Sequence, residues 1–139
     1  IFAAGDAVNY PDIINGMRRS ENNWTNAFLQ GRTAALNMLG SPEQFKMTYS
    51  YSALSMGLYI TALGDCSNVE DVVTKCDELH KRYERIFLRN GQITGAFLIN
   101  YFQDKAHLAR LIEKRINISQ WRDELGKITF DIHTIPVID

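Results

Sequence analysis

The residues best suited to chemistry in this 139-residue chain are Asp6 and the residues that begin the next helix. Asp6 follows Ile1-Phe2-Ala3-Ala4-Gly5, a run typical of a buried strand that ends in a turn. A carboxylate at such a strand end can accept strong hydrogen bonds from the hydroxyls of a sugar or polyol. The pair Gly5-Asp6 also suits a plain turn in which the carboxylate only caps the backbone. Both interpretations remain open from these residues.

The second group consists of Asn23, Trp24 and Thr25. Asn22 or Asn23 can serve as the N-cap of a helix predicted over residues 24–39. The first amides of a helix lack intrahelical acceptors and carry a partial positive charge. They therefore suit an anion or the electron-rich edge of a ring.

The predicted helix has one continuous face of apolar and small residues, spaced by three and four positions. This face comprises Trp24, Ala27, Phe28, Gly31, Ala34, Ala35, Met38 and Leu39. Gly40 and Pro42 form a strong stop signal. The small residues let another backbone approach closely, which is typical of a helix that lies against a sheet. We expect the face to be buried against the rest of the chain or against a second copy.

Strand patterns follow Pro42. Alternation predicts a strand over 45–51, and a second strand is expected over 56–63. Residues 66–79 are acidic and weakly periodic, which indicates a loop or a frayed helical turn. Asn90-Gly91 separates two apolar-rich runs, 81–89 and 92–99, and predicts a type I′ hairpin.

Helices are expected over 103–116 and, more briefly, over 119–125, whereas residues 127–139 form either a further strand or an ordered tail. The predicted fold class is therefore α+β, with an antiparallel four-stranded sheet backed by one or two helices. A strand, a loop over 7–21 and the helix over 24–39 precede this sheet.

Charge and composition exclude several classes of function. The net charge is −1, which gives no electrostatic basis for binding nucleic acid or an anionic membrane surface. No apolar run approaches the ~18 residues of a membrane span, and no signal peptide is recognisable, so a cytoplasmic location is expected. Cys66 and Cys76 are expected to be reduced. The histidines, His80, His107 and His133, have no ligand spacing, so no metal site and no catalytic residue is predicted.

A family resemblance rests on the first forty residues. Ile1-Phe2-Ala3-Ala4-Gly5-Asp6, followed by Trp24, Ala27, Gln30-Gly31-Arg32, Ala34-Ala35 and Asn37-Met38-Leu39-Gly40, resembles the last FAD-contacting segment of pyridine nucleotide-disulfide oxidoreductases. The similar branches are NADH oxidases, rubredoxin and ferredoxin reductases, and the nitrite reductase large subunit. Residues 56–65 and 83–99 more loosely resemble the C-terminal domain of the same family.

The resemblance implies a role for each residue of the first site. Asp6, behind Gly5, would hydrogen-bond a ribityl hydroxyl of FAD. The helix N-terminus at Asn23, Trp24 and Thr25 would face the pyrimidine edge of the flavin. The Trp24 ring would flank the flavin or, alternatively, anchor the helix in a core. NAD(P)H would be the co-substrate of the parent protein.

The resemblance also implies two domains. Residues 1–41 would be a remnant of an FAD-binding domain and residues 42–139 a C-terminal α+β interface domain. Neither glycine-rich dinucleotide motif is present, and the chain begins without methionine, so we expect a piece of a longer reductase that is inactive by itself. Expected partners are the FAD- and NAD-binding domains of the parent, a second copy, or an electron-transfer protein. The alternative function is a non-catalytic interaction module in which Tyr49, Tyr51, Tyr59 or Tyr101 serves an interface.

Overall fold

A computed structural model describes residues 1–12 and 14–137 of the chain. It divides into two compact units, Ile1–Tyr49 and Ser50–Asp139. Each unit is described by itself below. Within the described residues, none of the helices combines the length and the apolar character that crossing a membrane would require.

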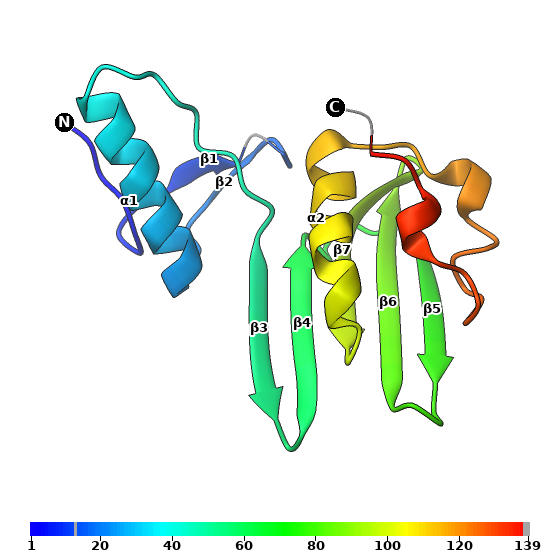
Figure 1. The fold of residues 1–139 in the computed structure, drawn as a ribbon. Coiled ribbons are helices and arrows are strands. Elements are labelled where there is room, and N and C mark those ends of the chain that lie inside the picture. Colours follow the sequence, from blue (N-terminus) through cyan, green and yellow to red (C-terminus); the bar gives the residue numbers. More distant parts are fainter. Residues whose placement is uncertain (13, 138–139) are drawn as a thin grey trace. The chain divides into compact units, whose positions relative to one another are not determined.

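The first unit is built on the helix α1, Trp24–Met38, as predicted. The Asn23 side chain caps this helix by accepting a hydrogen bond of 2.8 Å from the amide of Asn26. Before it, the stretch predicted as a loop over 7–21 contains a short antiparallel hairpin of β1, Tyr10–Asp12, and β2, Met17–Arg19. Figure 1 shows the N-terminal segment running alongside α1. Residue 13, inside the predicted loop, lies outside the described residues.

The predicted strand at the N-terminus is wrong. Residues 1–4 form no regular secondary structure, and no described strand pairs with them. A strand needs a neighbour whose backbone satisfies its N–H and C=O groups, and composition alone does not supply one.

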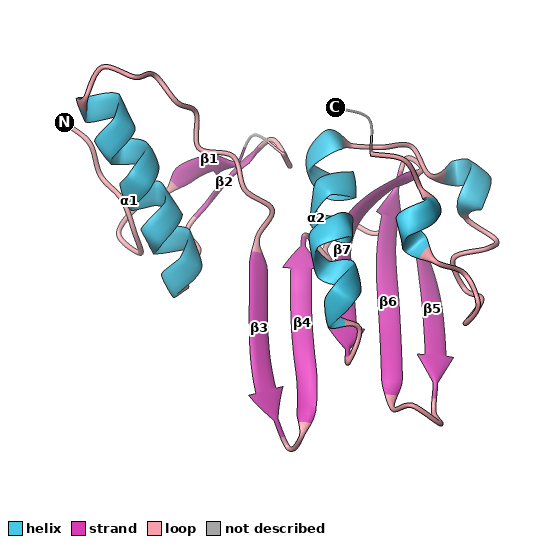
Figure 2. Ribbon diagram, viewed as in Figure 1, coloured by secondary structure: helices cyan, strands magenta, loops and turns pink. Residues whose placement is uncertain are grey.

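The second unit contains a five-stranded antiparallel sheet rather than the predicted four strands (Figure 2). The strand order is β3-β4-β7-β6-β5. Their bounds are β3 Ser50–Ser55, β4 Leu58–Gly64, β5 Asp71–Asp77, β6 Arg82–Arg89 and β7 Gln92–Ile99. The hairpin at Asn90-Gly91 is confirmed, and both turn residues have positive φ, 53° and 69°.

Two boundaries differ from the sequence prediction. The strand expected over 45–51 begins only at Ser50, because the alternating residues before it lie in an irregular segment. The stretch 66–79, expected to be a loop or frayed helix, contains β5. In β5 the buried position between Thr74 and Cys76 is occupied by Lys75, so the polar and apolar alternation is hidden.

One face of the sheet is covered by α2, Lys105–Lys114, and by the C-terminal segments. The 3₁₀ helices around it are η1 Phe102–Asp104, η2 Ser119–Trp121 and η3 Ile132–Thr134. Thus the helix predicted over 119–125 begins as a 3₁₀ turn, and the described part of 127–137 holds η3 and no strand. Residues 138 and 139 lie outside the described residues. The core beneath comprises Leu63, Ile86, Leu98, Leu108, Leu111, Ile118, Leu125, Ile132 and Ile135.

Candidate functional site

The Gly5-Asp6 turn is the first component of the candidate site. The carbonyl of Gly5 accepts a hydrogen bond of 3.0 Å from the amide of Val8, which closes the turn. Gly5 has φ +89°, a conformation that L side chains rarely adopt. The Asp6 side chain is exposed, and its carboxylate has no hydrogen-bond partner among the described residues. The turn is therefore closed by backbone alone, and the carboxylate does not cap it.

The N-terminus of α1 is the second component. Asn23 satisfies the amide of Asn26 through its side chain and the amide of Ala27 through its carbonyl. The amides of Trp24 and Thr25 have no acceptor within the described chain. The side-chain nitrogen Nδ2 of Asn23 is buried and also lacks an acceptor there. This helix end thus presents donors that an electron-rich group can satisfy.

A hydrogen bond and a close backbone approach place the turn beside this end of the helix. The amide of Gly5 donates a hydrogen bond of 2.8 Å to Oε1 of Gln30. A Cβ atom built on Gly5 would lie 3.7 Å from the Cβ of Ala27. Ala27 is three residues from Trp24, about 4.5 Å along the helix axis. The structure therefore brings Gly5 alongside the first turns of α1.

The Trp24 side chain is 87% exposed, so it does not anchor a core of the first unit. The apolar face predicted for α1 is exposed in the same way. Phe28, Met38 and Leu39 are all exposed, and a Cβ atom on Gly31 would meet no atom within 4 Å. The other residues of the first unit therefore do not cover this face, and its burial against the second unit or a second copy stays a prediction.

The buried side of α1 is polar instead. Asn26 and Gln30 are its buried residues, and Thr33 and Asn37 continue the stripe with spacings of three and four. Asn37 Nδ2 donates 2.8 Å hydrogen bonds to the carbonyls of Thr33 and Glu43. The sequence does not single out these polar residues as the buried side of α1. The polar stripe has the same helical period as the apolar stripe, and an apolar stripe is the usual buried side of a helix.

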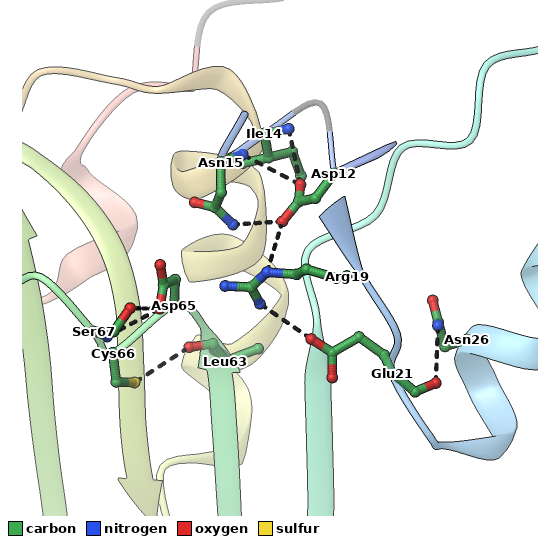
Figure 3. Close-up of polar contacts among 10 residues, drawn as sticks. All are labelled: Asp12, Ile14, Asn15, Arg19, Glu21, Asn26, Leu63, Asp65, Cys66 and Ser67. Carbon is green, nitrogen blue, oxygen red and sulfur yellow. Dashed lines mark hydrogen bonds and ion pairs between the residues drawn. The ribbon is translucent and has the colours of Figure 1, made fainter. Parts of the chain in front are cut away.

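A polar network fixes the start of α1 to the β1–β2 hairpin (Figure 3). Asn26 donates to the carbonyl of Glu21 at 3.2 Å, and the Glu21 carboxylate pairs with Arg19 at 3.2 Å. Arg19 also contacts Asp12 Oδ2 at 3.3 Å. Burial, together with the Glu21 and Asp12 carboxylates, raises the pKa of the neighbouring Tyr10. The hairpin therefore holds the helix N-terminus in place.

The second unit offers a different kind of surface. The face of the sheet opposite α2 is half exposed. It carries the Tyr83 and Phe97 rings in an edge-to-face pair, with their centroids 6.4 Å apart, within the range of about 4.5–7 Å usual for such pairs. The Arg85 guanidinium lies 5.6 Å from the centre of the Phe87 ring. Of the tyrosines proposed for an interface, Tyr51 is exposed and Tyr101 is buried.

The remaining candidates for chemistry are groups of metal-binding side chains and the two cysteines. Within the described residues, no group of three or more histidine, cysteine or acidic side chains is placed to hold a metal ion. Cys66 and Cys76 are both exposed, and the described chain contains no disulfide between them.

Comparison with known proteins identifies relatives of both units. Residues 54–116 match the family model of the rubredoxin NAD+ reductase C-terminal domain. The epsilon subunit of NADH-dependent phenylglyoxylate dehydrogenase from Aromatoleum evansii is 32% identical over 106 residues, covering 69% of this chain and 24% of that protein. Human apoptosis-inducing factor 3 is 28% identical over 103 residues, covering 73% of this chain and 17% of that protein.

A solved structure extends the similarity to nearly the whole chain. The covalent complex of putidaredoxin reductase with putidaredoxin matches with a TM-score of 0.85 and 12% identity, over 95% of this chain and 31% of that one. At this identity the match shows the fold alone. The chain thus spans less than a third of the length of each of these three proteins.

Proposed function

Since the chain belongs to the pyridine nucleotide-disulfide oxidoreductase family and corresponds to the C-terminal region of its rubredoxin and ferredoxin reductase branch, we propose that it forms one wall of an FAD site. Hydride acceptance from NAD(P)H is the chemistry that bound FAD supplies. The residues of this chain bind the cofactor, orient it and set the charge around it.

The observation that carries this proposal is the juxtaposition of Gly5 with the open N-terminus of α1. Asp6 follows Gly5 directly, and its carboxylate has no partner in the described chain. An ionised acceptor forms hydrogen bonds about twice as strong as a neutral one, which suits the hydroxyls of the ribityl chain. Asp6 therefore orients the flavin by binding its ribityl chain.

The helix N-terminus acts on the flavin ring, whereas Asp6 acts on the ribityl chain. The unpaired amides of Trp24 and Thr25 suit the carbonyl oxygens of the flavin pyrimidine edge. The partial positive charge of the helix end stabilises negative charge placed before it. The exposed Trp24 ring flanks the flavin and excludes water from one side.

The exposed apolar face of α1 supports the same proposal. An isolated soluble chain rarely exposes several large apolar side chains on one helix face. Phe28, Met38 and Leu39 are exposed here, and Gly31 leaves room for a close neighbour. We assign this face to packing against the FAD-binding domain of the parent protein.

The experiment that tests the proposal is FAD binding by the complete protein that carries this chain. We expect Asp6→Asn to weaken FAD binding about tenfold, because a neutral amide forms weaker hydrogen bonds with the ribityl hydroxyls. The dissociation constant is measured by titrating the apoprotein with FAD and following flavin fluorescence. The control variant is Asp123→Asn, at an exposed carboxylate of the second unit.

Equal affinities of Asp6→Asn, Asp123→Asn and the unchanged protein would refute the role of Asp6. A loss of FAD in both variants would indicate a general effect of charge instead of a specific contact. A second variant, Trp24→Ala, is expected to weaken binding and to change the visible flavin spectrum, since the ring environment changes.

A second candidate function, docking of an electron-transfer protein, is favoured by the open face of the sheet. The half-exposed Tyr83 and Phe97 rings, with Arg85 beside them, have the aromatic and arginine composition typical of interface centres. We expect Arg85→Glu to raise the Michaelis constant for the protein acceptor while leaving reduction of FAD by NAD(P)H unchanged. An unchanged constant would exclude this face as the docking surface.

A further inference from the structure

The segment that carries Asp6 is joined to α1 by a single hydrogen bond. Within the described residues, the 2.8 Å bond from the Gly5 amide to Oε1 of Gln30 is the one that links residues 1–8 to this helix. Figure 1 shows the same segment running alongside α1. The directional contact between the Asp6 segment and the helix is therefore made by Gln30.

Helix geometry places Gln30 for this contact. Ala27 and Gln30 are three residues apart, so they lie on the same side of α1. A Cβ atom built on Gly5 would lie 3.7 Å from the Cβ of Ala27, which is ordinary van der Waals contact. The small Ala27 side chain thus lets the Gly5 backbone approach, and Gln30 reaches its amide. Because Gln30 is 5% exposed, water competes little for this hydrogen bond.

The orientation of the Gln30 carboxamide follows from this partner. The group has an acceptor oxygen and a donor nitrogen, and the Gly5 amide can only donate, so the oxygen faces Gly5. The nitrogen Nε2 is then buried without an acceptor among the described residues. Burying such a donor costs free energy that a methionine at this position would avoid. What Gln30 provides, and an apolar residue could not, is its hold on Gly5.

The hold on Gly5 also determines where Asp6 lies. The Gly5 carbonyl accepts the amide of Val8 at 3.0 Å, and the Gly5 amide donates to Gln30, so both backbone groups of this residue are fixed. The Asp6 carboxylate has no partner of its own among the described residues. Its position therefore follows from the backbone of the turn, and a displacement of Gly5 would displace Asp6.

We propose that Gln30 is a positioning residue for the flavin site. By holding Gly5, it fixes the spacing between Asp6 and the N-terminus of α1. Two contacts can act on one ligand together only when their spacing matches the ligand, and holding them in place before binding lowers the entropic cost. The inference rests on the proposed function, because Asp6 is assigned there to the ribityl chain. Gln30 acts through Asp6 and not by contact with FAD.

A double-mutant cycle on FAD affinity in the complete protein tests this role. Gln30→Met keeps the length of the side chain but removes the hydrogen bond, and it is expected to weaken FAD binding about fivefold. In the Asp6→Ala background the same substitution is expected to change the affinity by less than about twofold, because Gln30 acts through Asp6. Titration of each apoprotein with FAD, followed by flavin fluorescence, gives the dissociation constants.

Asn37→Leu is the matched control. Asn37 lies further along the polar stripe of α1, and its Nδ2 donates to the carbonyls of Thr33 and Glu43 but to none in residues 1–8. Its loss is expected to lower the melting temperature while changing FAD affinity by less than about twofold. If Asn37→Leu weakens FAD binding as much as Gln30→Met does, the effect belongs to helix packing in general and the positioning role is refuted.

The outcomes separate this inference from the function on which it rests. An unchanged FAD affinity in Asp6→Ala would refute the role of Asp6 and the inference together. If Asp6→Ala weakens binding but Gln30→Met has no effect, or has the same effect with and without Asp6, only the positioning role fails. Hydrogen exchange of the Gly5 amide in the unchanged protein does not depend on the variants folding. Slow exchange is expected, and exchange at the rate of an unstructured peptide would refute the contact.

Discussion

The two units of this chain distribute polar and apolar residues in opposite ways. In the first unit, α1 buries Asn26 and Gln30 and exposes Trp24, Phe28 and Leu39. In the second unit, α2 buries Leu108, Leu111 and Ile112 on the sheet. The second unit has an apolar core of its own, whereas the apolar side of α1 is not covered by the other residues of the first unit. From this difference we expect substitutions on the apolar side of α1 to affect stability less than substitutions on the buried side of α2.

The largest expected effect concerns the one buried charge pair of the described second unit. Lys75→Met leaves the Glu84 carboxylate buried without its counter-charge, and we expect a loss of about 3–5 kcal/mol in the free energy of unfolding. Urea denaturation of the chain measures it. The double variant Lys75→Met/Glu84→Leu is expected to recover most of the loss, because no buried charge remains.

Lys127→Met is the matched control for this pair. Lys127 Nζ lies 2.6 Å from Glu124 Oε1, as close as the buried pair, but both side chains are about half exposed. Exposed pairs contribute about 0–1 kcal/mol. Similar losses in Lys75→Met and Lys127→Met would show that the pair in the core of the second unit is not shielded from water.

An intermediate effect contrasts the two helices directly. Leu111, on the buried side of α2, is fully buried, and Leu111→Ala is expected to cost about 3 kcal/mol. Leu39, which follows α1, is 81% exposed, and Leu39→Ala is expected to change stability by less than about 0.5 kcal/mol. Denaturant unfolding of the 139-residue chain measures both changes in the free energy of unfolding. A large loss for Leu39→Ala would mean that the α1 face is covered after all, and the contrast between the units would disappear.

The smallest expected effect is a pH dependence in the second unit. Burial and the neighbouring His133 lower the pKa of His107, whose ring centroid lies 4.7 Å from that of His133. The unfolded chain therefore takes up this proton at a higher pH than the folded chain does. Stability is retained above the unfolded pKa of about 6.5 and decreases as the pH falls below it.

Thermal melts between about pH 7.5 and 5 measure this dependence. In His107→Gln the side-chain amide can still donate to the carbonyl of Ile135, as the imidazole does at 3.1 Å, but it cannot titrate. We expect a shallower decline of the melting temperature in this variant than in the unchanged chain. Identical declines would assign the dependence to other groups.

Much of the second unit was predictable because its signals are local. Asn90-Gly91 specifies a turn by itself, and α2 has a regular apolar stripe. β5 was not predictable, because a lysine occupies a core position there and is tolerated only with Glu84 on the neighbouring strand. That pairing joins residues nine positions apart, and the alternation of either strand alone does not reveal it.

The residues of the candidate site were predictable from the sequence, but the contacts that hold them in place were not. Family resemblance assigned Asp6 and the helix N-terminus, and these remain proposals. The hydrogen bond from Gly5 to Gln30 joins residues 25 positions apart and has no sequence signature. The N-terminal strand was predicted wrongly because an apolar run does not specify a pairing partner. The apolar face of α1 likewise shows that periodicity predicts a face without predicting what covers it.

The most direct test of the central claim is an experimental structure of the complete protein with FAD. The account predicts a carboxylate oxygen of Asp6 within about 2.5–3.0 Å of a ribityl hydroxyl, and the amides of Trp24 and Thr25 directed at the pyrimidine edge. FAD bound elsewhere, with Asp6 in solvent or the α1 N-terminus directed away from the ring, would contradict it.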